Sequence, residues 1–387
     1  MRIEDFDYDL PPDRIAQAPA IRRDGARLML LDRAAPAPVD VAAPAAPAET
    51  TFDHLVDHLR EGDLVVLNDT RVLPARLRGR KPTGGRIEIL LLPEAAPVAV
   101  VAPVRVAAEL APAPPGGRAA MLSTSKGIHP GVRLDVGGGV EAVVLDEPAA
   151  GRTRLRFTAA GGDDTIADLL ERRGVMPLPP YIHREPDDPR EALDRERYQT
   201  VYAASDGAIA APTAGLHFTP ALLDLLPRRG IAVTRVTLHV GPGTFQPVRA
   251  AAIEDHVVEP EWCRLPAAAA AEIAACRARR GRVVAVGTTV TRVLESRAAG
   301  DGGQSGDGGR GGRDAVVPGD GWCDLYIRPG HRFRVVDALL TNLHLPRSSL
   351  LILVAAFAGR ERILGAYREA VRRDFRFYSY GDAMLIT

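Results

Sequence analysis

The chain has 387 residues, and its 49 Lys and Arg balance 49 Asp and Glu, so its formal net charge is zero. This length allows two or three domains, and a hydrophobic fraction of 46% with 25% charged residues is ordinary for a globular protein. The balance excludes a global positive field, so a nucleic-acid partner has to be met by a local basic patch.

Cysteine and lysine usage excludes further classes. The three cysteines, Cys263, Cys276 and Cys323, are too scattered for a disulfide framework or a thiolate metal site. Lys81 and Lys126 are the only lysines, which argues against Schiff-base chemistry and pyridoxal phosphate. The chain contains no run of about 18 apolar residues and begins on an acidic stretch without an apolar run, so we expect no membrane span, no secretory signal and a cytoplasmic location.

The first half of the chain predicts β-structure. Short apolar runs separated by Gly, Pro and Asp turns predict strands over 63–69, 86–92, 98–106, 132–136, 140–146 and 152–157. Short strands of this kind are typical of a small barrel or sandwich. The Ala/Pro-rich stretches 34–50 and 107–120 and the Gly-rich stretch 300–314 predict linkers or insertions, the last a flexible loop.

After residue 163 helical and strand patterns alternate, which favours an open α/β layer structure. Helices are expected over 165–174, 220–230, 266–281 and 360–374, and apolar strands over 231–240, 282–287, 324–328 and 350–359. The expected fold is therefore an α/β domain preceded or interrupted by a β module.

Polar loops follow several of the predicted strands. Ligands of open α/β sheets bind at the carboxyl ends of strands, and the candidates begin at Asn68, His239, Gly287 and Thr341. Thr288 and Thr289 open a helix that carries Arg292, which suits a phosphate or carboxylate, although a plain capped helix explains the pattern equally well. "HVGPGTFQPV" lacks the third glycine of the dinucleotide fingerprint and the lysine of a P-loop, so its glycines, Gly241 and Gly243, favour close backbone approach.

Histidines 217, 239 and 344 each lie in a loop at an element boundary, a pattern that favours a shared site. A metal-dependent hydrolase is the alternative reading, but HExxH and paired-Cys spacings are absent. Tyr198 and Tyr202 are four residues apart, so on a helix they form one face, either as a core stripe or as the wall of a pocket. The segment "FRFYSYGDAML" predicts a last strand at the edge of the pocket.

A series of motifs runs collinearly along the chain: "DFDYDLPPDRIAQ", "GDLVVLNDTRVLPARL", "MPLPPYI", "RYQTVYA", "APTAGLHFT", "VTLHVGPGTFQPV", "VGTTVTRVLES", "VDALLTNLHLPRSSLLILVAAFAG" and "FYSYGDAMLI". Together they resemble the S-adenosylmethionine:tRNA ribosyltransferase-isomerases of the queuosine pathway (the QueA family). The resemblance implies a three-layer α/β domain with an inserted small antiparallel β-barrel. On this chain we expect the α/β catalytic domain at 1–61 and 158–387, and the barrel domain at 62–157.

The implied reaction transfers the ribosyl part of S-adenosylmethionine to preQ1 at the tRNA wobble position. It isomerises the ribose to give epoxyqueuosine, with release of adenine and methionine. The implied partners are S-adenosylmethionine, consumed as a substrate, and tRNA; no metal or other cofactor and no membrane are implied, and a monomer is the default. Two departures from the family pattern stand near Lys126, where the usual Trp is missing, and at Glu259, where a His is usual.

Within this resemblance, His217 and His239 are the acid/base candidates, because an unshifted histidine titrates close to neutral pH. Tyr198, Tyr202 and Phe218 are expected to wall the pocket, and Tyr198 is also a catalytic candidate. Arg71, Arg292 and Thr288–Thr289 are expected to take a carboxylate or an RNA phosphate, Asn342 and His344 to orient the purine, and Asp382 to balance positive charge. The remaining expected binding residues come from the same motifs: Asn68, Asp69, Thr213, Gly215, Gly241, Gly243, Thr244 and Tyr380. A non-catalytic tRNA- or nucleotide-binding protein on the same fold is the alternative function.

Overall fold

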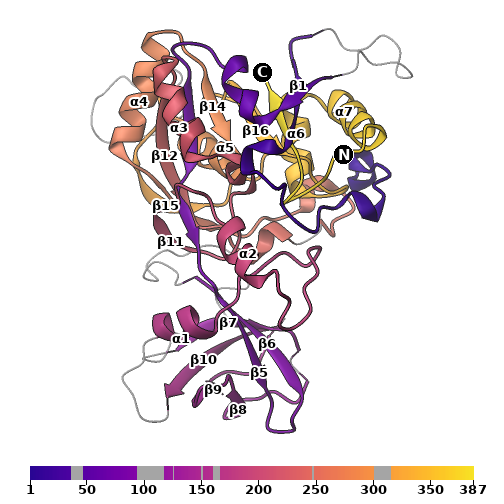
Figure 1. Ribbon diagram of the computed structural model, residues 1–387, viewed down its shortest axis with the longest axis vertical. Coiled ribbons are helices and arrows are strands. Elements are labelled where there is room, and N and C mark those ends of the chain that lie inside the picture. Colours follow the sequence, from indigo (N-terminus) through magenta and orange to yellow (C-terminus); the bar gives the residue numbers. More distant parts are fainter. Residues whose placement is uncertain are drawn as a thin grey trace.

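The computed structural model describes residues 1–35, 47–93, 117–124, 126–149, 151–159, 166–245, 248–299 and 315–387. An α/β domain fills the upper part of Figure 1, and a smaller barrel lies below it. The expected strand over 98–106 and the expected flexible loop over 300–314 lie outside the described residues, and the expected linkers over 34–50 and 107–120 do so in part.

The α/β domain is built on a nine-stranded mixed sheet. Its strands, in spatial order, are β15 (Gly319–Cys323), β13 (Glu261–Leu265), β12 (Ala232–Leu238), β3 (Leu64–Asn68), β14 (Val283–Val286), β16 (Ala338–Asn342), β17 (Ala383–Ile386), β1 (Arg27–Leu31) and β2 (Ala48–Thr51). The four central strands β12, β3, β14 and β16 are parallel, whereas β17 is antiparallel to β16. Central strands buried on both faces read as continuous apolar runs, as in "LVVL" and "VVAV".

Helices cover both faces of this sheet, which gives three layers. Alternate residues of β3 point to opposite faces: Leu64 and Val66 join one core cluster, Val65 and Leu67 the other. The first cluster contains residues of α4 (Ala267–Ala278), α5 (Thr288–Ser296), α6 (Ser349–Ala358) and α7 (Arg360–Arg372). The second contains residues of α3 (Pro220–Arg228) and of the 3₁₀-helix η4 (Phe52–His58). The predicted three-layer α/β arrangement is confirmed.

The second part is a closed antiparallel barrel, as expected. Its strands, in spatial order, are β10 (Arg152–Ala159), β7 (Arg118–Leu122), β6 (Arg86–Leu91), β5 (Arg76–Arg80), β8 (Arg133–Asp135) and β9 (Val140–Val144). Alternate residues such as Leu77, Ile89 and Ala142 fill its interior. The strand expected over 63–69 forms β3 of the large sheet, so the barrel strands begin only at Arg76; the domain limits at residues 62 and 157 stay a prediction.

Two strand predictions were wrong. Residues 350–358 lie in helix α6, and Gly359 follows its end. The apolar side chains of this segment cover every face of the helix, which is buried nearly all round. Ser348 marks its start, and its hydroxyl accepts a hydrogen bond from the Leu351 N–H at 3.2 Å. Residues 324–328 follow β15 as irregular chain, since the Leu325 carbonyl accepts from the side chain of Arg292 instead of from a neighbouring strand.

The chain returns from the barrel to the α/β domain through α1 (Ile166–Arg173), α2 (Glu191–Arg197) and β11 (Ser205–Ala208). Strand β11 pairs with β4 (Thr70–Val72), which lies on the segment that leads from β3 into the barrel. Tyr198 ends α2, so Tyr198 and Tyr202 do not share a helical face; they pack in two different core clusters. Within the described residues, none of the helices has the length and apolarity to cross a membrane.

Candidate active site at the carboxyl edge of the sheet

The carboxyl ends of the four parallel strands meet at one edge, where the chain also leaves β3 for the barrel (Figure 1). Asn68 ends β3, His239 follows β12, Gly287 follows β14 and Asn342 ends β16. Asp382 joins them, because Ala383 pairs with Asn342 at the start of the antiparallel β17. The strand-end geometry therefore assembles side chains that lie far apart in the sequence.

Two adjoining cavities lie at this edge. We name the first the strand-end compartment; it encloses about 630 Å³ and is open to solvent. Its lining includes Tyr181, Thr213, Val240, Gly287, Thr288, Thr289, Arg292, Thr341, Asn342, His344, Tyr378 and Ser379. The second, named the Glu259 compartment, encloses about 580 Å³, and its lining includes Gly243, His256, Glu259, Glu261 and Tyr326. Thr244, Arg292 and Leu350 line both, so the two compartments form one cleft that is open to solvent.

Arg292 forms the wall between the compartments. It projects from the first turns of α5, ion-pairs with Glu261, and donates to the carbonyls of Leu325 at 3.0 Å and Cys323 at 3.1 Å. Glu261 also accepts from the Gly241 N–H at 2.8 Å. Burial would lower the pKa of Arg292, but the neighbouring Glu261 carboxylate outweighs it and the pKa is raised. Arg292 is thus held in place where the two compartments meet, and each of its three side-chain nitrogens donates to an acceptor within the protein.

Asn342 presents an unpartnered acceptor. Its side-chain amide donates to the carbonyl of Tyr378 at 3.1 Å and contacts Asp382 O at 3.5 Å, which fixes the orientation of the amide. Its Oδ1 is buried and has no hydrogen-bond partner among the described residues. A buried acceptor without a partner costs about 1–3 kcal/mol, and Asn342 lines the strand-end compartment, which makes this oxygen a candidate ligand contact.

His217 lies behind Asn342. Its Nε2 accepts from the Asn342 amide at 3.3 Å, and its ring packs on Phe52 with centroids 4.9 Å apart. Burial lowers its pKa to about 4, with Asp382 acting in the opposite direction. The neutral imidazole also borders a third cavity, of about 260 Å³, together with Tyr380 and Ser379; Ser379 lines the strand-end compartment as well.

His239 is held differently. Its Nδ1 is 2.8 Å from the Thr70 hydroxyl, and its ring stacks on Trp262 at 5.1 Å. Partial burial lowers its pKa, while Asp69 and Asp206 oppose the shift. His239 is less buried than His217, and its Nε2 has no hydrogen-bond partner in the described part of the chain.

His344 and Asn68 are both buried and bonded within the protein. His344 lines the strand-end compartment; its Nε2 lies 2.8 Å from the Thr341 hydroxyl, and burial lowers its pKa to about 3. Asn68 bridges β3 and β12 by exchanging hydrogen bonds of 3.0 Å with both the N–H and the C=O of Leu238. Asn68 therefore fixes the strand ends from which the cleft is built.

The predicted aromatic wall lies in the core. Tyr198, Tyr202 and Phe218 are buried, and Tyr202 and Phe218 pack edge to face at 6.3 Å. Gly215 is required beside them, because a Cβ at that position would lie 2.0 Å from the Tyr202 hydroxyl. These residues support the loop that carries His217.

The other predicted binding residues are distributed around the edge. Arg71 is exposed, ion-pairs with Asp206 at 3.2 Å and donates to Ala203 O. Asp69 accepts from the Thr237 hydroxyl at 2.7 Å. Asp382 is buried and accepts from the backbone N–H groups of Arg27 and Arg376.

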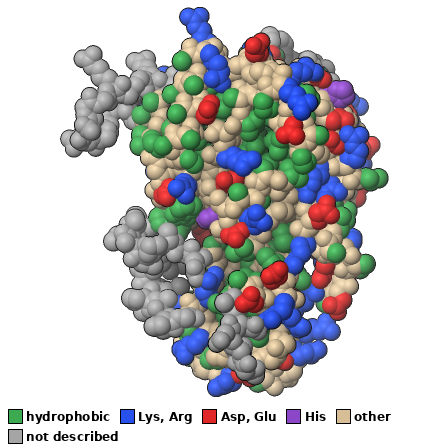
Figure 2. All heavy atoms as spheres, turned by 60° about the vertical axis from the view of Figure 1, so that its left-hand side comes forward, with side chains coloured by type: hydrophobic (Ala, Val, Ile, Leu, Met, Phe, Trp, Pro, Cys, Tyr) green, Lys and Arg blue, Asp and Glu red, His purple; other side chains and the backbone are tan. Residues whose placement is uncertain are grey.

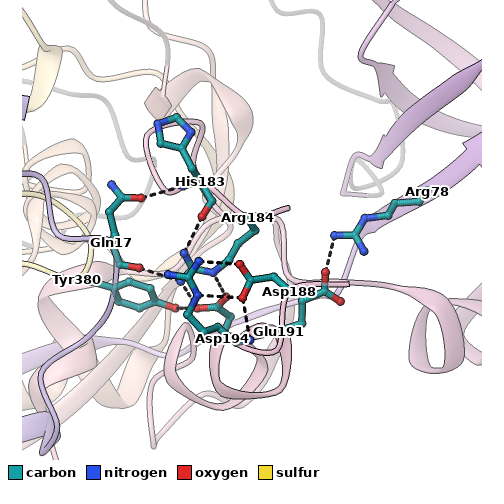
Figure 3. A network of polar contacts seen from close by, with 9 residues as sticks. Gln17, Arg78, His183, Arg184, Asp188, Glu191, Asp194 and Tyr380 are labelled. Atoms are coloured by element: carbon teal, nitrogen blue, oxygen red, sulfur yellow. Dashed lines mark hydrogen bonds and ion pairs between the residues drawn. The ribbon is translucent and has the colours of Figure 1, made fainter. Parts of the chain in front are cut away.

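Tyr380 belongs to a polar network that joins the barrel to the site loops (Figure 3). Its hydroxyl donates to Asp194 of α2 at 2.9 Å, and Asp194 forms a buried ion pair with Arg184 at 2.6 Å. One turn earlier on α2, Glu191 pairs with Arg78 of barrel strand β5 at 2.5 Å. Helix α2 therefore connects the barrel to the loop before β17.

Sequence reasoning missed Tyr181 and Glu261. Tyr181 packs edge-on against Tyr378 at 3.9 Å and contacts the Ser379 hydroxyl at 2.5 Å. The signal available was the pairing of aromatics in "MPLPPYI" and "FYSYGD". Tyr378 has a φ of +74°, an unusual conformation for an aromatic residue and one typical of functional sites.

Charge is distributed evenly on the face in Figure 2, where basic and acidic side chains are interspersed over both parts of the molecule. Among the described residues, no three His, Cys, Asp or Glu side chains come together in a way that could hold a metal ion. His217, His239 and His344 have separate hydrogen-bond partners: Asn342, Thr70 and Thr341.

Comparison with known proteins gives a match along the whole chain. The family model described as queuosine biosynthesis protein matches residues 3–386. Proteins named S-adenosylmethionine:tRNA ribosyltransferase-isomerase from Trichlorobacter lovleyi and Aquifex aeolicus are 47% and 44% identical, each over 386 residues, with 100% of both chains covered. A crystal structure of S-adenosylmethionine tRNA ribosyltransferase from Thermotoga maritima is 31% identical, with 99% of this chain covered, 100% of that chain covered and a TM-score of 0.49. The chain belongs to the queuosine biosynthesis protein family.

Proposed function

We propose that this chain is an S-adenosylmethionine:tRNA ribosyltransferase-isomerase. It transfers the ribosyl group of S-adenosylmethionine to the aminomethyl nitrogen of preQ1 in tRNA and isomerises that group to give epoxyqueuosine. In the overall reaction the amine nitrogen gains a bond to a ribosyl carbon, and the bonds from the ribosyl group to adenine and to the methionine sulfur break. The end-to-end match to enzymes of that name carries the proposal; a cleft with two adjoining compartments supports it.

We propose the strand-end compartment for S-adenosylmethionine. Arg292 and the start of α5 at Thr288 and Thr289 suit the substrate carboxylate, because a guanidinium and free helical N–H groups both favour an anion. The rings of Tyr181 and Tyr378 suit the sulfonium cation. Asn342 Oδ1 suits the exocyclic amine of adenine, which is an N–H donor.

We propose that His239 transfers the proton and that His217 has a positioning role. The sulfonium acidifies the neighbouring C5′ protons, and a base has to reach one of them. His239 directly precedes Val240, which lines the strand-end compartment, although His239 itself does not line it. It has a ring nitrogen without a partner in the described region and carboxylates nearby, whereas His217 Nε2 is occupied by Asn342. His217 therefore orients the amide of Asn342 in this proposal, and Tyr198 supports the core behind it.

The partner is a tRNA whose wobble base is splayed out of the anticodon loop, as single-stranded RNA bases are commonly recognised. We propose that the protein acts as a cytoplasmic monomer. Gel filtration with light scattering checks the oligomeric state.

Turnover tests the proposal. Purified protein treated with a chelator is incubated with S-adenosylmethionine and preQ1-containing tRNA, and the products are followed by mass spectrometry. The expected result is epoxyqueuosine in the tRNA with equimolar adenine and methionine. Binding of the tRNA without adenine release would favour the non-catalytic binding protein instead, and turnover that the chelator abolishes would point to the metal-dependent reading.

A further inference from the structure

The Glu259 compartment contains a carboxylate that the barrel holds in place. Arg152 of barrel strand β10 donates to Glu259 Oε1 at 2.5 Å, across 107 positions of sequence. The other carboxylate oxygen, Oε2, has no partner within the part of the chain that the structure describes. The Glu259 side chain is 38% exposed, so this oxygen can meet a ligand.

A tight backbone contact fixes the same side chain from the α/β side. A Cβ at Gly243 would lie 3.3 Å from Glu259 Cβ and 3.4 Å from Cγ and Cδ. Glycine at this position lets the loop after β12 pack directly on the Glu259 chain. The carboxylate is thus held between the loop and the barrel, and its Oε2 has no hydrogen-bond partner among the described residues.

Aromatic groups form another wall of this compartment. Tyr326 lies edge-on to His256 with centroids 5.2 Å apart, and its hydroxyl is buried without a partner among the described residues. Burial lowers the pKa of His256. The compartment therefore offers aromatic rings, an unpaired hydroxyl and a carboxylate oxygen, which together suit a planar, cationic, donor-rich group.

We propose that the Glu259 compartment receives the wobble base of the tRNA and that Glu259 recognises its protonated aminomethyl group. This inference rests on the proposed function, which requires two substrates to meet in one cleft. A primary alkyl amine is protonated at neutral pH, and a carboxylate is its strongest neutral-pH hydrogen-bond acceptor. Arg292 lines both compartments, whereas Asn342, the acceptor proposed for S-adenosylmethionine, lines only the adjoining one. Arg152 is then a positioning residue through which the barrel completes the base site.

Three tRNAs that differ only in the wobble base separate recognition of the aminomethyl group from the rest of tRNA binding. The first carries preQ1, the second carries the analogue with an uncharged cyano group in place of the aminomethyl group, and the third carries guanine. Their dissociation constants are measured by filter binding for the wild type and Glu259→Gln, and the affinity for S-adenosylmethionine by calorimetry. The wild type is expected to prefer the aminomethyl base. Glu259→Gln is expected to reduce that preference about 10- to 100-fold, the range for a lost charged hydrogen bond, with unchanged affinity for S-adenosylmethionine.

Arg152→Met is expected to reduce the preference less, because the carboxylate remains but loses its support. Glu141→Gln is the matched control, because Glu141 pairs with Arg133 on the barrel surface at 2.8 Å, away from the cleft residues. The Glu141→Gln protein is expected to prefer the aminomethyl base as strongly as the wild type does. Each preference is a ratio of two affinities in one preparation, so a partly unfolded sample does not change it.

An unchanged preference in Glu259→Gln would overturn the inference, and so would a loss confined to the affinity for S-adenosylmethionine. Failure of the proposed function has a different signature. The wild type would then release no adenine with any of the tRNAs, whatever its binding preference.

Discussion

Two glutamates of the cleft, Glu261 and Glu259, each pair with an arginine, and the two pairs are built in opposite ways. Arg292 and Glu261 lie within the α/β domain, with side chains 11% and 5% exposed, and each makes further hydrogen bonds to the backbone. Arg152 and Glu259 join the barrel to the α/β domain and are 25% and 38% exposed. The difference indicates a rigid half of the cleft, in which charge is fixed by the sheet edge, and an adjustable half, in which charge depends on the barrel.

Arg292→Met is expected to have the largest effect, because it leaves Glu261 buried without its partner. Breaking one side of a buried pair costs about 3–5 kcal/mol of unfolding free energy, and adenine release should be lost with it. Urea unfolding and kcat/KM measure the two effects. Arg292→Lys keeps the charge but not the planar fork, so its values should lie between wild type and Arg292→Met. A change below about 1 kcal/mol for Arg292→Met would remove the distinction between the two pairs.

The rigid half also predicts the pH dependence of stability. The pKa of His217 is about 4 in the folded protein against an ordinary 6.5, so the unfolded chain binds a proton that the folded protein excludes between these values. The stability from the neutral imidazole is complete above pH 6.5 and is lost as the pH falls to 4, by about 3 kcal/mol. Unfolding free energies across this range measure it. His217→Gln should flatten the curve, although His344 retains a contribution of the same sign; equal slopes in both proteins would contradict the burial of His217.

Packing beneath the site loop gives the next effect. Gly215→Ala places a Cβ against the Tyr202 hydroxyl and is expected to cost about 1–3 kcal/mol through overpacking. Gly365→Ala in α7 is the matched control, because no heavy atom lies within 4 Å of its added Cβ. That control should be neutral or stabilising by up to about 1 kcal/mol. Thermal unfolding compares the two variants. Equal melting temperatures would show that the loop carrying His217 can move to accommodate the added methyl group at little cost.

The smallest effect on stability is expected in the adjustable half. Arg152→Met should change the unfolding free energy by less than about 1 kcal/mol, because partly exposed pairs contribute little. Denaturant titration of Arg152→Met and Arg292→Met under the same conditions compares their losses of unfolding free energy. A loss as large as that of Arg292→Met would mean that the barrel is held as rigidly as the sheet edge.

Local patterns in the sequence predicted much of this fold. The barrel strands β6, β8, β9 and β10, the helices α1, α3, α4 and α7, and the positions of Asn68, His239 and Thr288 at strand ends follow from periodicity and turn residues. Strands β5 and β16 were not predicted, and the start of β7 was expected to be a linker. The α6 prediction was wrong because a short apolar run reads alike as a buried strand and a buried helix.

The contacts that organise the cleft could not be predicted in the same way. Glu261 meets Arg292 across 31 positions, and Glu259 meets Arg152 across 107, so both depend on tertiary packing. The environment of the unpartnered Asn342 oxygen likewise depends on tertiary structure, because it is set by the pairing of Asn342 with Ala383 at the start of β17. Residue roles at the site therefore rest on the structure more than on sequence pattern.

The most direct test of a reaction in this cleft is single-turnover adenine release by the wild type and by Asn342→Leu, with S-adenosylmethionine and preQ1-containing tRNA. The side chains are similar in size, but leucine cannot accept a hydrogen bond at the position of Oδ1. The wild type should release adenine, methionine and modified tRNA in equal amounts, while a folded Asn342→Leu should release adenine at least 100-fold more slowly, the scale for losing one oriented hydrogen bond in a transition state. A folded Asn342→Leu with the wild-type rate would contradict the account, because adenine would then leave from somewhere other than the strand-end compartment.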